Sequence, residues 1–566
     1  MKSIQKQTIK FKGFCGIDIR NTHTSPTGTS DLVNFRVGQD GTLIKRGGSR
    51  ELCDVEQEIF DVWTGRHQGG FTCFAAGSEK IMEIDLISGD IRNVCPCHSN
   101  VSKCQFFYYR GNLYLADGAG IWRVDSSALT QPFGYVPLIA KDWSDNQVGK
   151  IHQPRNLLND KGRLTYVISS AATSVLRLDD FISSVDSLYV NGKAVSSDRY
   201  TVGASSPYIS VSGLAAGDRV SLAVTYKSSP AGLEALKSCT KAFVFGDAQN
   251  SRPLLFGGTD DAVIHCGSAV SDGELTASRK AYAQSDALYF PADCSVTVGD
   301  GRYGIRALSR HYDRLLIFTE GGTWMASDAI GSTASLALMK INSSVGVCSR
   351  DGAALLGNSP CAVGHGSIYR WTSETDEHND CNAYSISEPI DSLLSEEFYR
   401  NARVFADKRH RELLFHCPQI TERVWVYSEI SKTWTSFTGL SAERFFETEN
   451  CLGWVSGSQI FLFDDTLTTD YGAPIPARFV GNPIDLGAAS HKRLSRVGMT
   501  LTGGKAVCGF MLDGKSNAEL NVSFSGERHT CAEKRLNSRR VSYAVPTVTA
   551  NDSARQQLHG LEITFK

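Results

Sequence analysis

A recurring hairpin pattern constrains this 566-residue sequence more than any other feature. Each copy has a short strand of small or apolar residues, a glycine or polar turn, and a second strand rich in aliphatic and aromatic residues. Six segments share the pattern: 70–90, 107–125, 307–325, 362–371, 413–434 and 448–465. An open sheet of so many strands would expose edges that invite aggregation, whereas radial repetition protects them. The repeats therefore predict an all-β fold built around a β-propeller of about six to eight blades.

The length and two changes of pattern predict further domains. One hydrophobic core cannot serve 566 residues, so several cores are expected. Residues 161–234 alternate strictly and contain Asn191-Gly192, a strong hairpin signal, which predicts a small β-sandwich inserted between two blades. The last stretch has longer strands and fewer aromatic residues, which predicts a separate C-terminal β-domain. The expected division is 1–55, an N-terminal docking segment with strands; 56–160, the first part of the propeller; 161–234, the insert; 235–470, the second part of the propeller; and 471–566, the C-terminal domain.

Charge and composition argue against several classes of protein. The net charge is −2 and the pI about 6.7, whereas dedicated nucleic-acid binders usually carry a strong basic excess. No run of 18 apolar residues occurs, so no membrane span is expected, and the polar N-terminus predicts no signal peptide. Most of the 16 cysteines stand singly in apolar strand-like runs, as expected for free thiols in a protein made in a reducing cytosol.

Three short motifs could carry chemistry, and each has a plainer interpretation. Residues 299–304 match the G-x-G-x-x-G pattern of dinucleotide sites, but the sequence after them alternates as a strand, which favours a hairpin turn. A close set of soft ligands could bind zinc: Cys95, Cys97, His98 and Cys104. The usual zinc spacing is missing there, which favours a loop with incidental cysteines. The acidic residues 374–380 could bind a divalent cation, but the bend glycine of a calcium loop is absent, which favours a solvated loop.

Motifs of catalysis are missing from the sequence. It contains neither a G-x-S-x-G nucleophile elbow nor an H-E-x-x-H zinc motif. Acidic residues are abundant, but no pattern pairs two of them as a glycosidase would require. The chain is therefore expected not to be an enzyme, and no catalytic residue, cofactor or metal ligand is assigned.

Segments at the start, middle and end of the chain are similar to one family. The N-terminal region has a G-x-D-x-R motif, an Asn-Phe pair and a D-G-T-hydrophobe-x-K-R-x-G turn: Gly16, Asp18, Arg20, Asn34, Phe35, Asp40, Gly41, Thr42, Lys45, Arg46 and Gly48. Residues 288–324 contain YFP, VGDG and a strand that ends in Trp324, and residues 484–500 read IDLGAASHKRLSRVGMT. These segments resemble the β-propeller nozzle, or tail-tube, proteins of short-tailed bacteriophages.

The resemblance implies a structural function in the virion. The chain would be a nozzle subunit of the tail that forms a homo-oligomeric ring, expected to be a hexamer, and extends the DNA channel. Such a ring retains the genome and allows its ejection, so double-stranded DNA would pass without sequence-specific contacts. Its other partners would be portal-adaptor proteins and tail fibre or needle proteins. The protein would be made in the cytoplasm of the bacterial host and end in the tail of the virion.

Three other interpretations stay open on the sequence. The first is a head-to-tail adaptor or genome-stabilising hub of the same family. The second is a propeller that binds or cleaves host glycans, and the third is a cellular scaffold propeller. The position of the protein in a virion would identify an adaptor or hub. Binding or cleavage of polysaccharide would identify the glycan-directed propeller, and absence from purified virions would identify the cellular scaffold.

Basic residues are the candidates for contacts with partners. Residues expected to serve assembly or docking are Arg20, Lys45, Arg46, Lys492 and Arg493. Residues that could face a channel or a neighbouring subunit are Arg306, Arg310 and Arg314. Two further basic groups are 408–411 and the set Lys534, Arg535, Arg539 and Arg540. Arginines on one strand face could contact phosphate, but pairing with acids of a neighbouring subunit is favoured.

Overall fold

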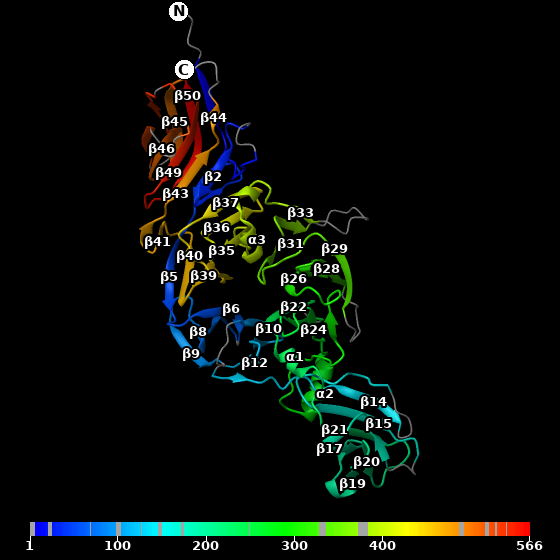
Figure 1. The fold of residues 1–566 in the computed structure, drawn as a ribbon. Coiled ribbons are helices and arrows are strands. Elements are labelled where there is room, and N and C mark those ends of the chain that lie inside the picture. Colours follow the sequence, from blue (N-terminus) through cyan, green and yellow to red (C-terminus); the bar gives the residue numbers. More distant parts are fainter. Residues whose placement is uncertain are drawn as a thin grey trace, which may run out of the picture.

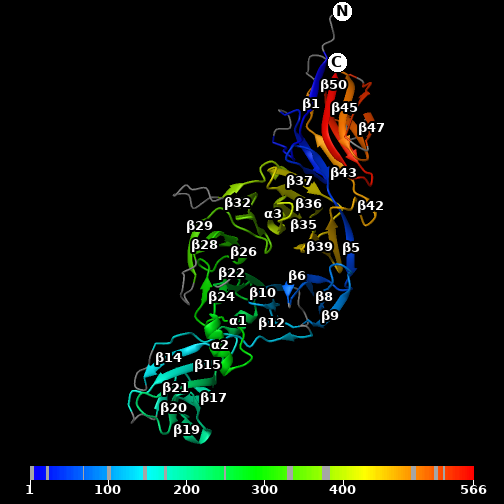
Figure 2. The same cartoon turned by 180° about the vertical axis from the view of Figure 1, so that it is seen from behind.

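The computed structural model describes residues 6–20, 25–67, 69–97, 103–125, 127–144, 150–170, 175–247, 250–327, 336–371, 383–485, 492–514, 520–526, 529–538 and 540–566. Strands dominate them, and the prediction of an all-β fold with a propeller, an inserted β-sandwich and a terminal β-domain is confirmed. Figures 1 and 2 show three bodies in a row: a sandwich that holds both ends of the chain, the propeller, and the inserted domain. Across these ranges, no helix is long and apolar enough to cross a membrane.

Seven blades of four strands surround a common axis in the described chain. The strands of each blade pair antiparallel from the axis outward, and β38 of the last blade contacts β6 of the first. Blade one contains β6 (Ile59–His67), β7 (Gly70–Gly77), β8 (Lys80–Ile84) and β9 (Ile91–Pro96). Blade two contains β10 (Gln105–Tyr109), β11 (Asn112–Ala116), β12 (Ile121–Val124) and β13 (Leu129–Thr130). Blade three contains β22 (Lys241–Phe245), β23 (Arg252–Phe256), β24 (Val263–Cys266) and β25 (Ser295–Thr297).

The remaining blades follow in sequence order, except for one strand that comes from the start of the chain. Blades four to seven contain β26 (Ile305–His311), β27 (Arg314–Thr319), β28 (Gly322–Ser327) and β29 (Ala337–Asn342); β30 (Ala353–Leu356), β31 (Ser359–Val363), β32 (Ile368–Trp371) and β33 (Ala383–Ser385); β34 (Arg403–Asp407), β35 (Glu412–Cys417), β36 (Thr421–Ser428) and β37 (Thr433–Phe437); and β38 (Arg444–Glu447), β39 (Leu452–Ser456), β40 (Gln459–Asp464) and β5 (Gly48–Asp54). Short helices connect some strands: η1 (Ser197–Arg199), α1 (Leu233–Lys237), α2 (Asp272–Ala281), η2 (Asp391–Leu393) and α3 (Glu396–Asn401).

The propeller's hydrophobic cores lie between consecutive blades. Each blade is covered on both faces, so its middle strands are continuous apolar runs rather than alternating ones. β35 is buried along its whole length, and β27 along all but its first residue. Between blades six and seven the core contains Val426, Trp454 and Phe461, among others. This packing explains why the hairpins were recognisable in the sequence as paired hydrophobic runs.

The N-terminal segment closes the propeller. β5 is the outer strand of blade seven and pairs antiparallel with β40, where Cys53 lies opposite Ile460. The last blade therefore joins strands from both ends of the propeller sequence, and the ring cannot open without breaking a sheet. Gly48 begins β5 and lies so close to the chain after β40 that an added Cβ would be 2.1 Å from the carbonyl oxygen of Thr469. Only glycine fits this approach.

The inserted domain begins earlier than the predicted residue 161. One sheet contains β14 (Leu138–Ser144), β15 (Lys161–Val167), β21 (Arg219–Tyr226), β17 (Ile182–Val190) and β18 (Lys193–Ala194), and the other contains β16 (Val175–Arg177), β20 (Tyr208–Val211) and β19 (Tyr200–Val202). The predicted Asn191-Gly192 turn joins β17 to β18, with positive φ at both residues. β14 was missed because it pairs in parallel with β15, which no local hairpin signal announces.

The terminal sandwich combines both ends of the chain. Its first sheet contains β1 (Gln7–Phe11), β3 (Phe35–Val37), β4 (Leu43–Lys45), β50 (Gln557–Phe565), β45 (Leu494–Thr502) and β48 (Thr530–Arg535). The second contains β2 (Thr29–Val33), β43 (Ala477–Gly481), β44 (Ile484–Asp485), β49 (Tyr543–Ala550), β46 (Lys505–Leu512) and β47 (Leu520–Ser525). Residues 1–55 do not form a domain of their own, because four of their strands belong to this sandwich and the fifth to blade seven. The docking role predicted for this segment stays a prediction.

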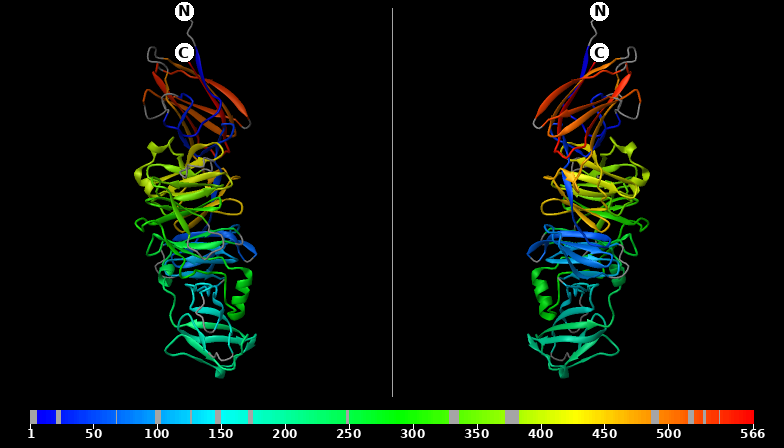
Figure 3. Two further views of the ribbon diagram at one scale, coloured as in Figure 1. Left: turned by 90° about the vertical axis from the view of Figure 1, so that its right-hand side faces the viewer. Right: turned by 90° about the vertical axis from the view of Figure 1, so that its left-hand side faces the viewer.

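The sandwich and the insert are attached at opposite edges of the propeller disc. The insert leaves between blades two and three, whereas the sandwich adjoins blades six and seven, where β41 (Thr469–Asp470) and β42 (Ala473–Pro474) extend the sheet of blade seven. Figure 3 shows the disc from its edge, with both end modules continuing its plane. The two flat faces of the disc are therefore left uncovered by these modules.

Removal of residues 1–54 tests the closure of the propeller. We expect the shortened chain to lose cooperative thermal unfolding and soluble expression, because β40 then presents an unpaired edge and the sandwich lacks four strands. Removal of residues 1–6 alone should leave the melting curve of the full chain unchanged. A chain of residues 55–566 that melts like the full protein would contradict this closure.

Candidate functional site: a charged joint between propeller and terminal sandwich

β2 connects the propeller to the sandwich through a continuous sheet. Its residue Val33 pairs in parallel with Ser436 of β37 in blade six and antiparallel with Arg478 of β43 in the sandwich. The backbone hydrogen bonds of blade six therefore continue into the sandwich. Many side chains around β2, where the propeller meets the sandwich, are charged although they are largely buried. We call this group of side chains the joint.

Arg46 lies at the centre of the joint with a fully buried side chain. Its Nη1 donates to Oδ1 of Asp470 at 3.0 Å, and its Nε donates to Oδ1 of Asn34 at 2.9 Å. Its Nη2 also donates to the carbonyl oxygen of Thr438 at 3.1 Å. A buried guanidinium is tolerated only when its donors are satisfied, and these contacts satisfy it from blade seven, the sandwich and blade six.

Two more ion-pair systems cross the same boundary. Arg36 of β3 donates through Nε to both carboxylate oxygens of Glu412 in β35, at 2.9 and 3.1 Å. Asp31 of β2 accepts from Arg423 of β36 at 3.0 Å and also pairs with Arg478 of β43. Each system joins a strand of the N-terminal segment to blade six. The propeller and the sandwich are thus held together by several charge pairs, of which Arg36–Glu412 is among the more buried.

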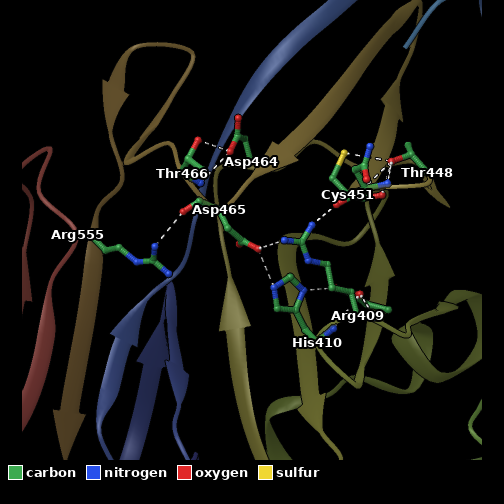
Figure 4. Close-up of polar contacts among 10 residues, drawn as sticks. Arg409, His410, Thr448, Cys451, Asp464, Asp465, Thr466 and Arg555 are labelled. Atoms are coloured by element: carbon green, nitrogen blue, oxygen red, sulfur yellow. Dashed lines mark hydrogen bonds and ion pairs between the residues drawn. The ribbon is translucent and has the colours of Figure 1, made fainter. Parts of the chain in front are cut away.

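His410, in the turn between β34 and β35, lies between two carboxylates (Figure 4). Its Nδ1 is 2.7 Å from Oδ2 of Asp407, and its Nε2 is 3.2 Å from Oδ2 of Asp465, just after β40. Burial alone would lower the pKa of His410, but the hydrogen bonds to Asp407 and Asp465 outweigh it and raise the pKa to about 9. The hydrogen bond from His410 in turn lowers the pKa of Asp465 to about 2.

Asp465 also joins the sandwich to this cluster. Figure 4 shows it between His410 and Arg555, whose Nη1 donates to the backbone oxygen of Asp465 at 3.2 Å. Arg409 adds a second cation, with its Nη2 3.5 Å from the Asp465 carboxylate. The cluster therefore connects blade six, blade seven and the loop before β50.

Asp407, His410 and Glu412 lie close enough to hold a metal ion, but their chemistry favours an ion-pair network. With a pKa near 9, His410 is protonated at neutral pH and has no free lone pair for a metal. Glu412 is already engaged by Arg36. The sequence pointed to 408–411 only as a basic group, and the acids that define its role, Asp407 and Asp465, were missed because one of them is distant in the chain.

The structure contradicts two of the predicted docking residues. The Lys45 side chain is buried, and its Nζ donates to the backbone oxygen of Asp552 at 2.5 Å. Arg46 is equally buried in the joint. Neither can contact a partner molecule, because the lysine-arginine pair ends β4 inside the molecule. The motif that carried the family resemblance is thus an internal structural element at these positions.

The other predicted docking residues reach the surface. Arg20 is half exposed and pairs with Asp18 and with Glu388, at 2.9 Å in each case. Lys492 contacts Gln7 and lies over the ring of Phe565, with Nζ 5.4 Å from the centroid. Arg493 is exposed and makes no side-chain ion pair within the described part of the chain. Lys492 and Arg493 lie just before β45, and the backbone of Arg493 pairs with that of Lys566 at the C-terminus. Figure 1 shows this end of the chain at the outer end of the sandwich.

The three arginines of blade four differ from one another. Arg306 is paired with Glu320 through Nε at 2.8 Å and with Asp261 at 3.2 Å, so its charge is neutralised within the chain. Arg310 and Arg314 are exposed, on either side of Tyr312, whose exposed fraction is 47%. Neither arginine is ion-paired among the residues that the structure describes, although Arg310 donates to the backbone oxygens of Tyr312 and Gly246 at 2.8 and 3.2 Å. This turn therefore presents two cations without a salt bridge and an aromatic ring.

The short motifs have the following positions. Gly299 and Gly301 adopt positive φ in the connection between β25 of blade three and β26 of blade four. A turn is therefore present, but it is not the predicted hairpin, because β25 and β26 belong to different sheets. Burial raises the pKa values of Cys95, Cys97 and Cys104, which disfavours their thiolate forms, and His98 lies outside the described residues. The acidic segment 374–380 and Arg539 also lie outside them. The fifteen cysteines that are described are free thiols.

Comparisons with known proteins concern the fold only. No family model and no curated protein matches the sequence. Among solved structures, the WD40 domain of SCAP from fission yeast is 9% identical with a TM-score of 0.31, over 74% of this chain and 94% of that one. The AfRom2 CNH domain is also 9% identical with a TM-score of 0.31, over 74% and 99%. A chain of a mitotic checkpoint complex is 8% identical with a TM-score of 0.34, over 73% and 92%. At these levels the likenesses carry no information on function.

Replacement of Arg46 by Gln distinguishes an internal role from docking. We expect Arg46→Gln to lower the free energy of unfolding by about 3–5 kcal/mol, because it leaves the Asp470 carboxylate buried without its cation. Arg493→Gln, at an exposed residue, should change it by less than about 0.5 kcal/mol. Urea denaturation of both variants measures the difference. Equal stabilities would mean that Arg46 does not hold the joint.

His410 should make the free energy of unfolding decrease as the pH rises above neutral. Its pKa is raised from 6.5 to about 9, so its contribution is complete below pH 6.5 and disappears as the pH rises through 9. We expect the wild-type free energy of unfolding to fall by up to about 3 kcal/mol over this range relative to that of His410→Gln. Urea denaturation at several pH values measures both profiles. If the free energies of unfolding of the two proteins changed equally with pH, His410 would not be held in its protonated form by the two carboxylates.

Proposed function

We propose that this chain is a non-catalytic, ring-forming subunit of a short bacteriophage tail, at the position of the nozzle. The observation that supports it best is the joint, which fixes the sandwich to the propeller in a stiff, elongated molecule. Arg46 and Asp470 sit inside this joint, and Arg36 with Glu412 span it. A subunit that must transmit force along a tail needs such a rigid connection between its modules. The resemblance of the N-terminal motifs to nozzle proteins agrees with this assignment.

The elongated shape suits subunits that stand side by side around DNA. Closed rings form when identical subunits pack head to tail with the correct rotation. The channel would then lie between subunits rather than along the propeller axis, where the ion pairs Arg444–Asp61 and Lys241–Asp351 link the innermost strands of different blades. A net charge of −2 suits such a wall, because strong attraction to phosphate would slow the passage of DNA.

Different surfaces would serve different partners. Arg310, Tyr312 and Arg314 form the exposed turn of blade four, and arginine and tyrosine are the residues most enriched at interface hot spots. We assign this turn to contacts between neighbouring subunits. Lys492 and Arg493, at the outer end of the sandwich, are assigned to the adaptor above. The insert, at the far end, would then face the tail fibre or needle proteins.

Electron microscopy of phage particles tests the proposal. An antibody fragment against the inserted domain should label a ring in the tail of particles that carry this gene. The same images separate a nozzle from an adaptor or hub, because the hub would lie directly at the portal. Absence of the chain from purified virions would reject the tail assignment, and a position outside the tail would do the same.

Charge reversal tests the subunit contact separately. The double change Arg310→Glu and Arg314→Glu should reduce incorporation of the protein into particles at least tenfold, because the two new carboxylates would meet acids of the neighbour as like charges. Lys193→Glu, an exposed change on the insert, is the matched control and should leave incorporation unchanged. Equal incorporation of both variants would remove blade four from the interface. Circular dichroism of each purified variant confirms that it is folded.

A further inference from the structure

A cavity of about 580 Å³ opens on one face of the propeller, at the axis. Its walls come from the beginnings of the innermost strands and the loops before them, in six of the seven blades. The charged residues that line it are Glu58, Lys103, Lys241, Arg350, Asp351, Arg400, Arg403, Glu443 and Arg444. Six of these side chains are basic and three are acidic. The end modules continue the plane of the disc, so neither covers this mouth (Figure 3).

Asp351 holds the centre of the cavity and is surrounded by cations. Its Oδ1 pairs with Lys241, and its Oδ2 is 3.8 Å from Arg403 and 4.0 Å from Arg444. Burial alone would raise the pKa of Asp351, but the nearby charges of Lys241 and Arg444 outweigh it and hold the pKa well below its usual value. One carboxylate therefore serves three cations at this point.

Asp61, deeper between the blades, neutralises only one of these cations. Its Oδ1 accepts from Nη1 of Arg444 at 2.9 Å, and its Oδ2 accepts from the backbone nitrogen of Phe106 at 2.7 Å. Arg403 uses its Nη1 for the backbone oxygen of Glu443 at 2.7 Å. The inner part of the cavity therefore keeps more positive than negative charge after all its ion pairs are formed.

Arg350 increases this excess. It is half-buried, and its Nη2 donates to the hydroxyl of Thr240, but it makes no ion pair in the described ranges. Burial lowers the pKa of its guanidinium, and the nearby charge of Asp351 offsets this only in part. With Lys241, Arg403 and Arg444 it makes four cations against two carboxylates. The acids Glu58 and Glu443 also line the cavity and make no ion pair with these groups in the described chain.

We propose that this axial cavity binds a small free oxyanion with at least two negative charges, of the pyrophosphate class. Guanidinium groups match phosphate oxygens with paired hydrogen bonds, and three arginines converge here. The volume lies in the range of small-ligand sites and is too small for a nucleic-acid duplex. The bound anion would neutralise the excess charge and draw together the first strands of six blades. This inference is independent of the proposed role in the tail.

Isothermal titration of the full chain with pyrophosphate, at constant pH and 0.15 M chloride, tests the site. We expect one saturable event per chain. Arg350→Gln should weaken binding about tenfold, because it removes a charged hydrogen bond and leaves no carboxylate orphaned. Glu443→Gln should strengthen binding about threefold, since it removes a negative charge from the wall of the cavity. Arg66→Gln, at the other end of innermost strand β6 with an 82% exposed side chain, is the matched control and should stay within twofold.

Opposite effects of Arg350→Gln and Glu443→Gln cannot come from a general loss of structure. Thermal melting of each variant without ligand checks that it is folded. The proposal is overturned if the wild-type chain shows no saturable binding, or if Arg350→Gln binds as well as Arg66→Gln. It is also overturned if a hexaglutamate peptide binds more tightly than pyrophosphate, because an acidic protein segment would then be the occupant.

Discussion

The guanidinium of Arg46 contacts three parts of the molecule at once. Asp470 belongs to the extended sheet of blade seven, Thr438 follows the last strand of blade six, and Asn34 stands between two strands of the sandwich. Burial of a guanidinium costs free energy, and this cost is offset only while all three parts stay in hydrogen-bonding positions around it. Arg46 immediately precedes Gly47 and β5, so the segment that closes the propeller also carries the buried cation of the joint. The N-terminal segment is therefore the element that makes one rigid molecule of two folding units.

The blades could be predicted because their strands are neighbours in sequence. Hydrophobic runs on both sides of a turn indicate a hairpin wherever they occur, and β35 with β36 is an example. Pairings between distant strands leave no such trace. β5 pairs with β40 across some 400 residues, and β14 pairs with β15 in parallel. The boundaries at 55 and 161 were misplaced for this reason, since a strand's sequence shows that it needs a partner without showing which one.

The charged sites were also only partly predictable, because their partners are distant in the sequence. The sequence identified the basic residues but not the acids that decide their role. Lys45 and Arg46 belong to a motif that looks like a surface turn, yet both are buried among groups more than 400 residues away. The cavity is harder to predict from the sequence, because each of six blades contributes only two to four residues to its wall and no spacing connects them. Arg350 is ordinary in sequence, and its unpaired charge becomes visible only when six blades meet.

The two proposed surfaces are electrically separate although both are cationic. The cavity lies where the innermost strands begin, and the turn with Arg310 and Arg314 lies where one of them, β26, ends. β26 has seven residues, which corresponds to a length of about 23 Å. Exposed charges interact over a Debye length of about 8 Å at physiological ionic strength. A change at the turn therefore alters the field in the cavity little, and an anion in the cavity does little to the turn. Assembly and anion binding can consequently be measured separately on one folded chain. A result that contradicts one of the two proposals does not contradict the other.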